Sequence, residues 1–539
     1  IGGAYRWDTD HWTPLTDWLS DGNLLGCESI APDPTNANRV YAAMGGYTQS
    51  WAGNGVILRS PDQGRTWRRA EMPFKMGGNE DGRSAGERLV VDPHLPRVLL
   101  FGSRKNGLWR STDAGATWDA VGSFPVPGDD KGIGVTFEVF DTNRGAAGRP
   151  TPTIYVGVAD APAALYRSTD AGATWAPVPG QPAGMVPEHG VLTPNGSLYL
   201  TYGNAPGPNG MSDGAVWKYD TLASAWADIS PVKPASAGGF GYAGLAVDAQ
   251  HPRTVMAATM DWWGHHDDIF RSTDGGAHWA SLGDHSTRDA SVSPWIGGGS
   301  TIDSLGHWIA ALAIDPFQSG HVLYGTGATI WGAQDVTAMD AGQTTHWAVA
   351  ARGLEETAVI ALVSPPAGPH LISAVGDIGG FRHDDLTVSP RAGNFTNPTF
   401  GSTTGLDFAE QSPGVVVRVG NAWSGNRPGA VSTDGAASWT AFGAEPAGSK
   451  GGGSVAVSAD GRAIVWTPQD GTPSFSHDRG GTWQACGGLG KGIDVVSDRV
   501  SPATFYAYDP KSAALYTSKD GGAHFTARTL SVSGGQGRV

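Results

Sequence analysis

The chain has 539 residues, among them 80 glycines, 36 prolines and 21 tryptophans, and a formal net charge of −15. This length predicts two large domains or an array of repeats, and the tryptophan content excludes a disordered chain. The negative charge disfavours nucleic acids and anionic membranes as partners, whereas neutral sugars need no counter-charge. Frequent glycine and proline favour an all-β fold with many tight turns.

One short motif, Ser-x-Asp-x-Gly-x-Thr-Trp, recurs along the chain after a degenerate first copy at 8–12. Copies or variants occupy Ser60–Trp67, Ser111–Trp118, Ser168–Trp175, Asp220–Trp226, Ser272–Trp279, Ser432–Trp439, Ser476–Trp483 and Ser518–Phe525. Their aspartates are 42–57 residues apart, except for one step of 160 residues, in which we place weak units at 334–347 and at Asp384. Such a period predicts about eleven stacked units, each a β-propeller blade of four short strands.

Each copy of this motif, an Asp box, is interpreted as a structural hairpin turn rather than as a catalytic site. The aspartate can accept backbone N–H groups across the turn, and the glycine tolerates positive φ. The Ser and Thr hydroxyls can close the loop, and the tryptophan can fill the gap between blades. The segments 107–110 and 268–271, which precede two of the boxes, alternate as strands do.

A larger duplication divides the repeats into two series. The segment Ile1–Asp8 matches Ile378–Asp384 with one gap, and each opens a series. We therefore predict a first β-propeller at 1–350, with about seven blades but lacking its first strand, and a second at 351–539, with about four blades present. A second propeller this short predicts a chain that is truncated, with the second propeller incomplete.

Function is expected where the sequence departs from the repeats. The leading candidate is Asp377, which lies between Gly376 and Ile378-Gly-Gly380 at the opening of the second series. The glycines after it permit a ligand to approach the backbone closely. The alternative is that Asp377 only caps a turn.

Several aromatic residues also depart from the repeats. Trp262 and Trp263 are adjacent, and because neighbouring residues in a strand point in opposite directions, at least one ring should be exposed, on a loop. Tyr47, Trp51 and Trp331 occupy similar positions beside expected strands. For any one ring, core packing is the alternative, but the set favours a cleft in which sugars stack on aromatic faces.

No metal or cofactor is predicted. His265 and His266 are followed by two aspartates, but no second group of ligands accompanies them. Cys27 and Cys486 are far apart, fit no zinc or redox spacing, and are interpreted as buried thiols. No apolar run of 18 residues is present, so no membrane span is expected, and no signal peptide is visible.

Taken together, these segments resemble glycoside hydrolase family 74, the xyloglucan-cleaving endoglucanases and related oligoxyloglucan hydrolases. The resemblance covers essentially the whole chain. Its carriers are Ile1–Asp8, Gly86–Pro93, Trp262–Trp263, Ile314–Phe317, Leu323–Ile330, Gly353–Ala358 and Gly376–Asp385.

The resemblance implies two seven-bladed propellers facing each other across an open cleft, and an inverting endo-β-1,4-glucanase that uses two aspartates. Asp377 matches the catalytic acid, and the base falls one residue before Ile1, so the chain as given is expected to be inactive or weak. Trp262 and Trp263 are implied to bind substrate, as are Tyr47, Trp51 and Trp331 on weaker grounds. The resemblance further implies a secreted protein without cofactor or metal that acts on xyloglucan or a related β-glucan; we expect a monomer.

Two other functions also fit an Asp-box propeller. A sialidase would need three converging arginines and a Tyr-Glu pair, and the sequence lacks the usual opening of that pattern. A non-catalytic propeller, acting as a glycan-binding or interaction scaffold, explains the repeats but not the Gly-Asp-Ile-Gly-Gly segment or the aromatic set. The residues alone leave endo and chain-end action open.

Overall fold

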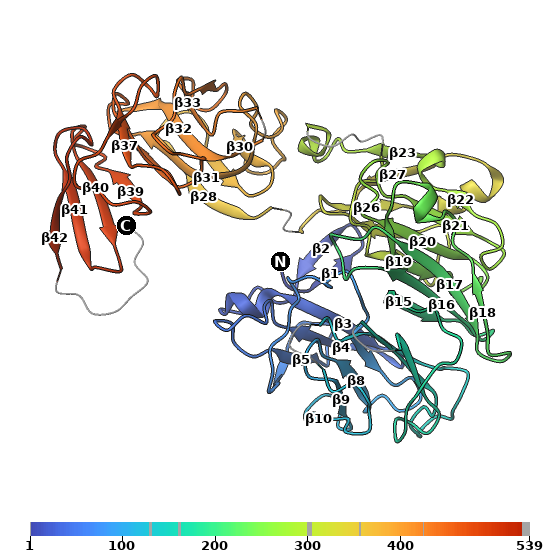
Figure 1. Cartoon of the computed structure of the whole chain (residues 1–539). Helices are drawn as coiled ribbons and strands as arrows, with labels where there is room; N and C mark the ends of the chain where they lie inside the picture. The colour runs from blue at the N-terminus through green and yellow to red at the C-terminus, as the bar shows by residue number, and fades with distance from the viewer. Residues whose placement is uncertain are drawn as a thin grey trace. The chain divides into compact units, whose positions relative to one another are not determined.

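The computed structural model describes residues 2–128, 132–159, 163–298, 304–354, 357–423 and 425–530. The regular structure in these ranges is mostly strand (Figure 1). Its helices are short 3-10 segments: η1 (Gly22–Leu25), η2 (Pro234–Ser236), η3 (Gly283–His285), η4 (Pro294–Gly298) and η5 (Val336–Ala341). Within these ranges no helix is long and apolar enough to cross a membrane. The predicted all-β fold class is confirmed.

The chain divides into two compact units, one formed by 1–289 and 302–356 and the other by 290–301 and 357–539. Each unit is built from small antiparallel sheets whose strands follow one another in chain order. This meander is the arrangement of a propeller blade, and it brings sequence neighbours together as hydrogen-bonded strands.

The first unit begins with a hairpin and continues with six sheets. The hairpin is β1 (Tyr5–Asp8) and β2 (His11–Pro14). The sheets are β3 (Cys27–Asp33), β4 (Asn36–Met44), β5 (Val56–Ser60) and β6 (Arg68–Glu71); β7 (Leu89–Val91), β8 (Leu99–Gly102), β9 (Leu108–Ser111) and β10 (Asp119–Ala120); β11 (Val135–Phe140), β12 (Ile154–Val158), β13 (Leu165–Ser168) and β14 (Ala176–Pro177); β15 (Val186–Leu192), β16 (Ser197–Gly203), β17 (Gly214–Asp220) and β18 (Ala225–Asp228); β19 (Gly241–Val247), β20 (Val255–Met260), β21 (Ile269–Ser272) and β22 (Ala280–Ser281); and β24 (Leu312–Ile314), β25 (Val322–Gly325), β26 (Ile330–Ala333) and β27 (Thr345–Val349), with β23 (Ser286–Asp289) parallel to β27.

The sheets of the second unit follow the same plan. Its strands are β28 (Val359–Val363), β29 (Leu371–Val375) and β30 (Gly379–His383); β31 (Phe400–Ala409), β32 (Ser412–Ala422), β33 (Gly429–Ser432) and β34 (Thr440–Ala441); β35 (Ser454–Val457), β36 (Ile464–Thr467), β37 (Ser474–Ser476) and β38 (Gln484–Ala485); and β39 (Val495–Ser497), β40 (Phe505–Asp509), β41 (Ala514–Ser518) and β42 (Thr526–Thr529). One parallel bridge, Gly379 to Ser402, joins the first two groups into a single seven-stranded sheet.

In the first unit, the first strand of each sheet packs against the first strand of the next, from β3 through β7, β11, β15 and β19 to β24. The sheets therefore follow one another around a common centre (Figure 1). The hairpin meets the chain beyond β27, because the Trp12 N–H donates to the Arg352 carbonyl (2.8 Å) and the Trp12 indole donates to the Ala350 carbonyl (2.7 Å). Gly353 is required there, since its φ is +84° and a Cβ would lie 2.3 Å from the Trp12 oxygen.

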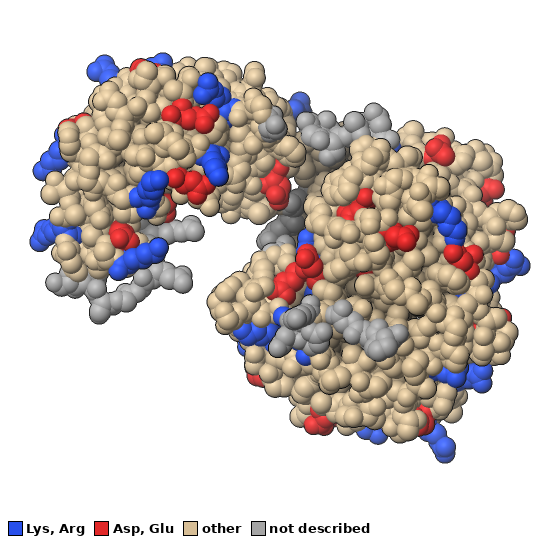
Figure 2. Space-filling view, viewed as in Figure 1, with Lys and Arg blue, Asp and Glu red and all other residues tan. Residues whose placement is uncertain are grey.

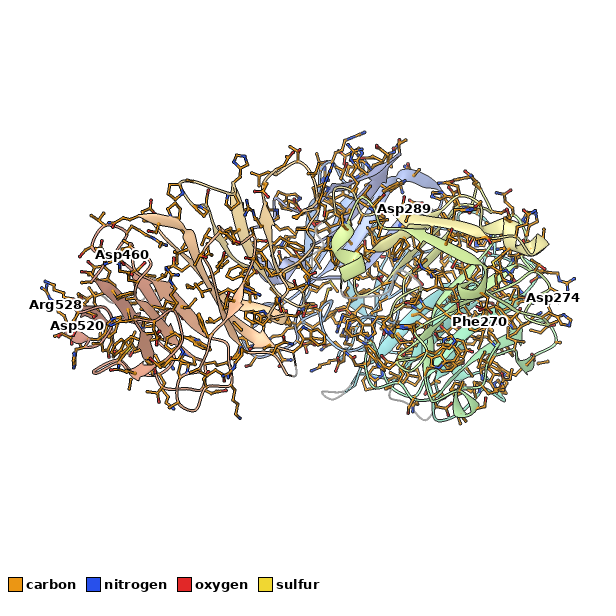
Figure 3. The ribbon with its side chains drawn as sticks, turned by 90° about the horizontal axis from the view of Figure 1, so that it is seen from above. Phe270, Asp274, Asp289, Asp460, Asp520 and Arg528 are labelled. Atoms are coloured by element: carbon orange, nitrogen blue, oxygen red, sulfur yellow. The ribbon has the colours of Figure 1, made fainter. Side chains whose placement is uncertain are left out.

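The Asp boxes form the closed turns that their residues predict. In the first full copy, Asp62 accepts the backbone N–H of Thr66 (2.8 Å), its hydroxyl (2.7 Å) and the Ser60 hydroxyl (2.8 Å). These bonds, led by the Thr66 hydroxyl, lower the pKa of Asp62. The pattern recurs in both units, and Figure 3 labels two of its aspartates, Asp274 and Asp520, at the periphery of the view. A carboxylate satisfied in this way has a structural role.

The box tryptophans lie between neighbouring sheets, as expected. The Trp279 indole donates to the Ile229 carbonyl (2.7 Å), just beyond the last strand of the preceding sheet. The Trp483 indole likewise donates to Ala444 (3.0 Å) and packs beside Trp466. These two boxes therefore both close their own hairpins and hold their sheets against the preceding ones.

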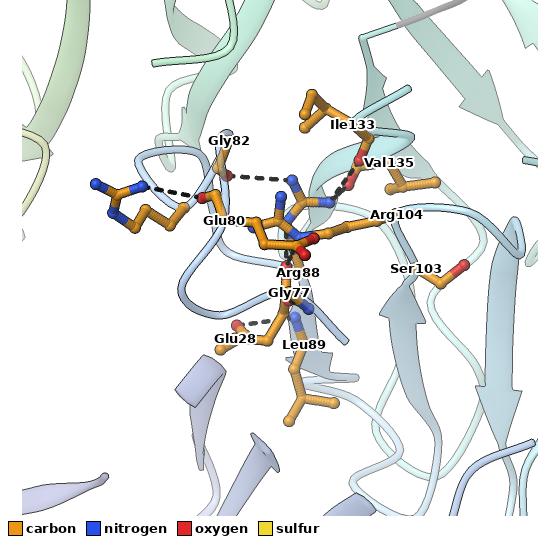
Figure 4. Close-up of polar contacts among 12 residues, drawn as sticks. Glu28, Gly77, Glu80, Gly82, Arg88, Leu89, Ser103, Arg104, Ile133 and Val135 are labelled. Carbon is orange, nitrogen blue, oxygen red and sulfur yellow. Dashed lines mark hydrogen bonds and ion pairs between the residues drawn. The ribbon is translucent and has the colours of Figure 1, made fainter. Parts of the chain in front are cut away.

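A cluster of charged side chains is buried among the inner strands of the first unit. Arg104 and Arg88 both pair with Glu28, at 2.6 Å and 3.2 Å between Nε and Oε1, and all three side chains are at most 3% exposed (Figure 4). Glu138 on β11 and Glu188 on β15 lie in the same inner ring and are also buried. Among the described residues, neither oxygen of Glu138 has a hydrogen-bond partner. Burial raises the pKa of Glu138 and of Glu188 well above the ordinary value.

This arrangement makes a prediction for the pH dependence of stability. Because the pKa of Glu138 is raised in the folded protein, the stability linked to its proton is present at low pH and is lost as pH rises toward the raised value. Glu138→Gln removes this loss, so the variant should be more stable than the wild type at neutral pH, by roughly 1–3 kcal/mol. Urea unfolding of both proteins at several pH values between about 5 and 8 measures the effect.

The matched control is Glu71→Gln, which changes an exposed glutamate on β6 and should leave the pH profile unchanged. Identical profiles for Glu138→Gln and the wild type would mean that the buried carboxyl is not costly to ionise.

Candidate functional site

Asp377 occupies the turn between β29 and β30 and is exposed to solvent. Its backbone is held in the left-handed region, with φ +66°, and its N–H donates to the Ser402 hydroxyl (3.1 Å). The flanking Gly376 N–H donates to the Ala358 carbonyl (2.8 Å). Within the described part of the chain, no hydrogen-bond donor contacts the Asp377 carboxylate, unlike those of the box aspartates. The backbone of the turn is therefore fixed while the carboxylate stays free, which argues against a role as a turn cap.

Gly379 and Gly380 are required by the packing of the sheet, which the sequence alone does not indicate. A Cβ on Gly380, whose φ is +154°, would lie 2.1 Å from the Ser373 carbonyl oxygen of the neighbouring strand. A Cβ on Gly379, whose φ is +80°, would lie 3.3 Å from the Phe400 carbonyl. Close packing within the sheet therefore requires these glycines, whether or not a ligand approaches them.

Trp262 and Trp263 lie on the connection between β20 and β21 and have different environments. Trp262 is 8% exposed, stacks on Phe240 (4.4 Å between ring centroids) and on His265 (4.0 Å), and donates from its indole to Ala237 (2.7 Å). Trp263 is 55% exposed. The expectation that at least one of the pair is exposed, on a loop, is confirmed. Trp262 belongs to the core, and the binding of substrate by both rings stays a prediction.

The exposed ring of Trp263 is supported from one side. It stacks on His307 (4.4 Å, interplanar angle 29°) and meets the edge of Trp308 (5.9 Å, 90°). The buried carboxyl of Asp267 accepts the N–H groups of Trp262 (3.0 Å) and Trp308 (2.7 Å), which ties the two aromatic segments together. Burial raises the pKa of Asp267 to about 7. Trp263 is thus a preorganised aromatic surface.

The two aspartates that follow His265 and His266 form hydrogen bonds within the protein. Asp267 accepts backbone N–H groups as above, and Asp268 accepts the Ser281 hydroxyl (2.6 Å) and the Gly283 N–H (2.9 Å). In the described ranges, no group of three or more His, Cys, Asp or Glu side chains is placed to hold a metal ion.

Of the three remaining aromatic candidates, two lie together and one is buried. Trp51 is 69% exposed and lies 5.0 Å from the half-buried ring of Tyr47 on the connection between β4 and β5. The Tyr47 hydroxyl accepts a hydrogen bond from Asn79 (2.6 Å). Trp331 is 4% exposed within β26, and its role in binding stays a prediction.

The exposed candidates occupy equivalent places in their blades. Asp377, Trp263 and the Tyr47–Trp51 pair each lie on the connection between the second and third strands of a blade. The Asp boxes lie on the connection between the third and fourth strands. Because successive antiparallel strands alternate in direction, these two kinds of connection lie on opposite faces of a propeller. Each unit therefore carries a structural face with the boxes and a face with exposed candidate residues.

Sequence reasoning did not select His307, Trp308 or Trp423. The only sequence signal for the first two was an adjacent aromatic pair within the long gap between boxes. Trp423, which is 60% exposed, lies on the connection between β32 and β33, again between the second and third strands of a blade.

Repeated four-stranded sheets and Asp-box turns define an Asp-box β-propeller protein, which carries exposed aromatic residues on the opposite connections. The comparisons with known proteins narrow this class.

No protein-family model matches the chain. The chain is 47% identical over 562 residues to a xyloglucanase from Paenibacillus sp, covering 98% of this chain and 54% of the relative. It is 46% identical over 560 residues to the xyloglucanase Xgh74A of Acetivibrio thermocellus, covering 98% and 66%. It is similar to the crystal structure of the GH74 xyloglucanase from Xanthomonas campestris, with a TM-score of 0.92 and 44% identity over 98% of this chain and 76% of that chain.

The chain belongs to glycoside hydrolase family 74. It spans 54% and 66% of the lengths of the two curated relatives above. The family resemblance inferred from the sequence is confirmed.

The different environments of the paired tryptophans predict different effects on stability. Trp262→Ala should lower the free energy of unfolding by about 3–5 kcal/mol, because it empties a buried site between Phe240 and His265. Trp263→Ala should lower it by less than about 1 kcal/mol, because the ring is half in solvent. Urea denaturation of the two variants beside the wild type measures both values. Equal losses would contradict the assignment of one ring to the core and the other to the surface.

Proposed function

We propose that the chain is part of a secreted hydrolase that cleaves the β-1,4-glucan backbone of xyloglucan internally and with inversion, with Asp377 as the general acid. The observation that carries the proposal is the free carboxylate of Asp377 on a turn whose backbone is fixed by Ser402 and Ala358. The names of the curated relatives and of the similar solved structure, all xyloglucanases, support the substrate.

In the proposed reaction, the Asp377 carboxyl donates its proton to the oxygen of the leaving sugar. A second carboxylate activates a water molecule on the opposite face of the sugar ring, and inversion requires the two carboxyl groups to be about 6.5–9.5 Å apart. The internal duplication matches Asp377 to a position one residue before Ile1, and we assign the base to an aspartate there. A fixed backbone at Asp377 favours the reaction, because proton donation requires the carboxyl group to be held close to the oxygen of the leaving sugar.

A neutral polysaccharide suits the surface of the chain. Charged side chains are scattered over the visible face in Figure 2. The exposed rings of Trp263 and Trp51 offer flat apolar surfaces to pyranose rings. Because such rings lie on more than one blade, a long chain can lie across them, which favours internal cleavage over cleavage at a chain end.

Substitution of Asp377 tests the assignment of the acid. In a chain carrying one added aspartate before Ile1, Asp377→Asn should reduce the rate of xyloglucan hydrolysis by about 10²–10⁴-fold, because the amide has no proton to donate. Asparagine is the right substitute, since it tolerates a φ of +66° better than alanine does. The release of reducing ends from tamarind xyloglucan gives the rate, and an early fall in viscosity identifies internal cleavage.

The control is Asp384→Asn, which alters an exposed aspartate paired with Arg382 at the other end of β30 and should leave the rate unchanged. Full activity of Asp377→Asn would contradict the proposed acid. Binding of xyloglucan by the extended chain without any cleavage would support a non-catalytic glycan-binding propeller instead.

A further inference from the structure

Trp423 is an exposed tryptophan in the second unit to which neither the Asp boxes nor the sequence motifs assign a role. It directly follows β32, and 60% of it is exposed. No aromatic ring or cation stacks on it within the described part of the chain. Single exposed tryptophans are common on protein surfaces, so a role in binding has to be argued from the residues beside Trp423.

The neighbourhood of Trp423 connects it to Asp377. In the pairing of β31 with β32, Phe400 lies opposite Ala422, and Ser402 lies opposite Asn421. Gly401 lies between these positions, and a Cβ built on it would be 3.6 Å from the Trp423 indole nitrogen. The indole therefore lies beside Gly401.

The next residue along β31 is Ser402, whose hydroxyl accepts a hydrogen bond from the Asp377 N–H (3.1 Å). Ser402 also forms the single bridge to β30, the strand that follows the Asp377 turn. Two consecutive residues, Gly401 and Ser402, thus contact the indole and the Asp377 turn respectively. Asp377 precedes β30 and Trp423 follows β32, and these two strands flank β31, so the two groups are about two strand spacings, or roughly 10 Å, apart.

We propose that Trp423 is a stacking platform for a sugar ring of the β-glucan chain, close to the bond that Asp377 cleaves. The inference rests on the proposed function and adds to it a binding position within the second unit. An indole face recognises the apolar face of a neutral pyranose, and a short stretch of the polymer can reach from Asp377 to Trp423. Gly401 itself contributes no side chain beside the indole.

The test measures binding separately from cleavage. The full chain carrying Asp377→Asn, which cannot use the proposed acid, is run by affinity electrophoresis through gels containing tamarind xyloglucan. Adding Trp423→Ala should raise the dissociation constant about tenfold, which corresponds to about 1.4 kcal/mol. Trp423→Tyr, which keeps a ring, should recover most of the affinity.

The matched control is Leu386→Ala, which removes an exposed apolar side chain (64% exposed) beyond the far end of β30 and should not alter retardation. Because Trp423 is exposed, all variants should unfold at the same urea concentration as the parent.

The outcomes separate the two proposals. If the parent binds xyloglucan and Trp423→Ala binds equally well, or if Trp423→Tyr is as weak as Trp423→Ala, the platform is wrong while xyloglucan as ligand stands. If the parent is not retarded at all, the proposed substrate fails and the platform fails with it.

Discussion

The structure depends on one constraint: a small antiparallel sheet has two faces and cannot bury both of them alone. In the first unit the solution is to place the first strand of each sheet against the first strand of the next, from β3 round to β24. The box tryptophans fill the wedge that opens between sheets farther from the centre, as Trp279 does against Ile229. Because inner strands and boxes provide this packing, the exposed side chains on the opposite connections, such as Trp263 and Asp377, are not needed for it.

The same division of labour separates three kinds of carboxylate. Box aspartates are saturated by hydrogen bonds, and Thr482 above all lowers the pKa of Asp478 to about 2. Glu138, buried without a partner among the described residues, has the opposite shift. Asp377 belongs to neither group, because its backbone is held and its carboxylate is open to solvent. A general acid that protonates a sugar oxygen needs a carboxyl group that is held in position and is not already hydrogen-bonded within the protein.

Much of this could be predicted because the controlling interactions are local in sequence. All the partners of a box aspartate lie within a few residues, as Ser60 and Thr66 do for Asp62, so motif and spacing together predicted hairpins and blades. Asp377 could be found because the duplication set it apart. The burial of Trp331 could not be read from its neighbours in sequence, since it depends on strand pairing with Tyr324 and Val349.

The paired tryptophans and Trp423 mark the limit of local reasoning. The period of a strand indicates that one of two adjacent rings is exposed, but which one is decided by Phe240, more than twenty residues before Trp262. Trp423 has no motif around it, and its relation to Asp377 runs through Gly401 and Ser402 on another strand. Strand pairing converts distances of 20 to 50 residues along the chain into neighbouring positions on one edge of a sheet. Residues that lie together on a binding surface are therefore far apart in the sequence. The spacing of the boxes predicts the blades, but it does not predict which exposed residues become neighbours.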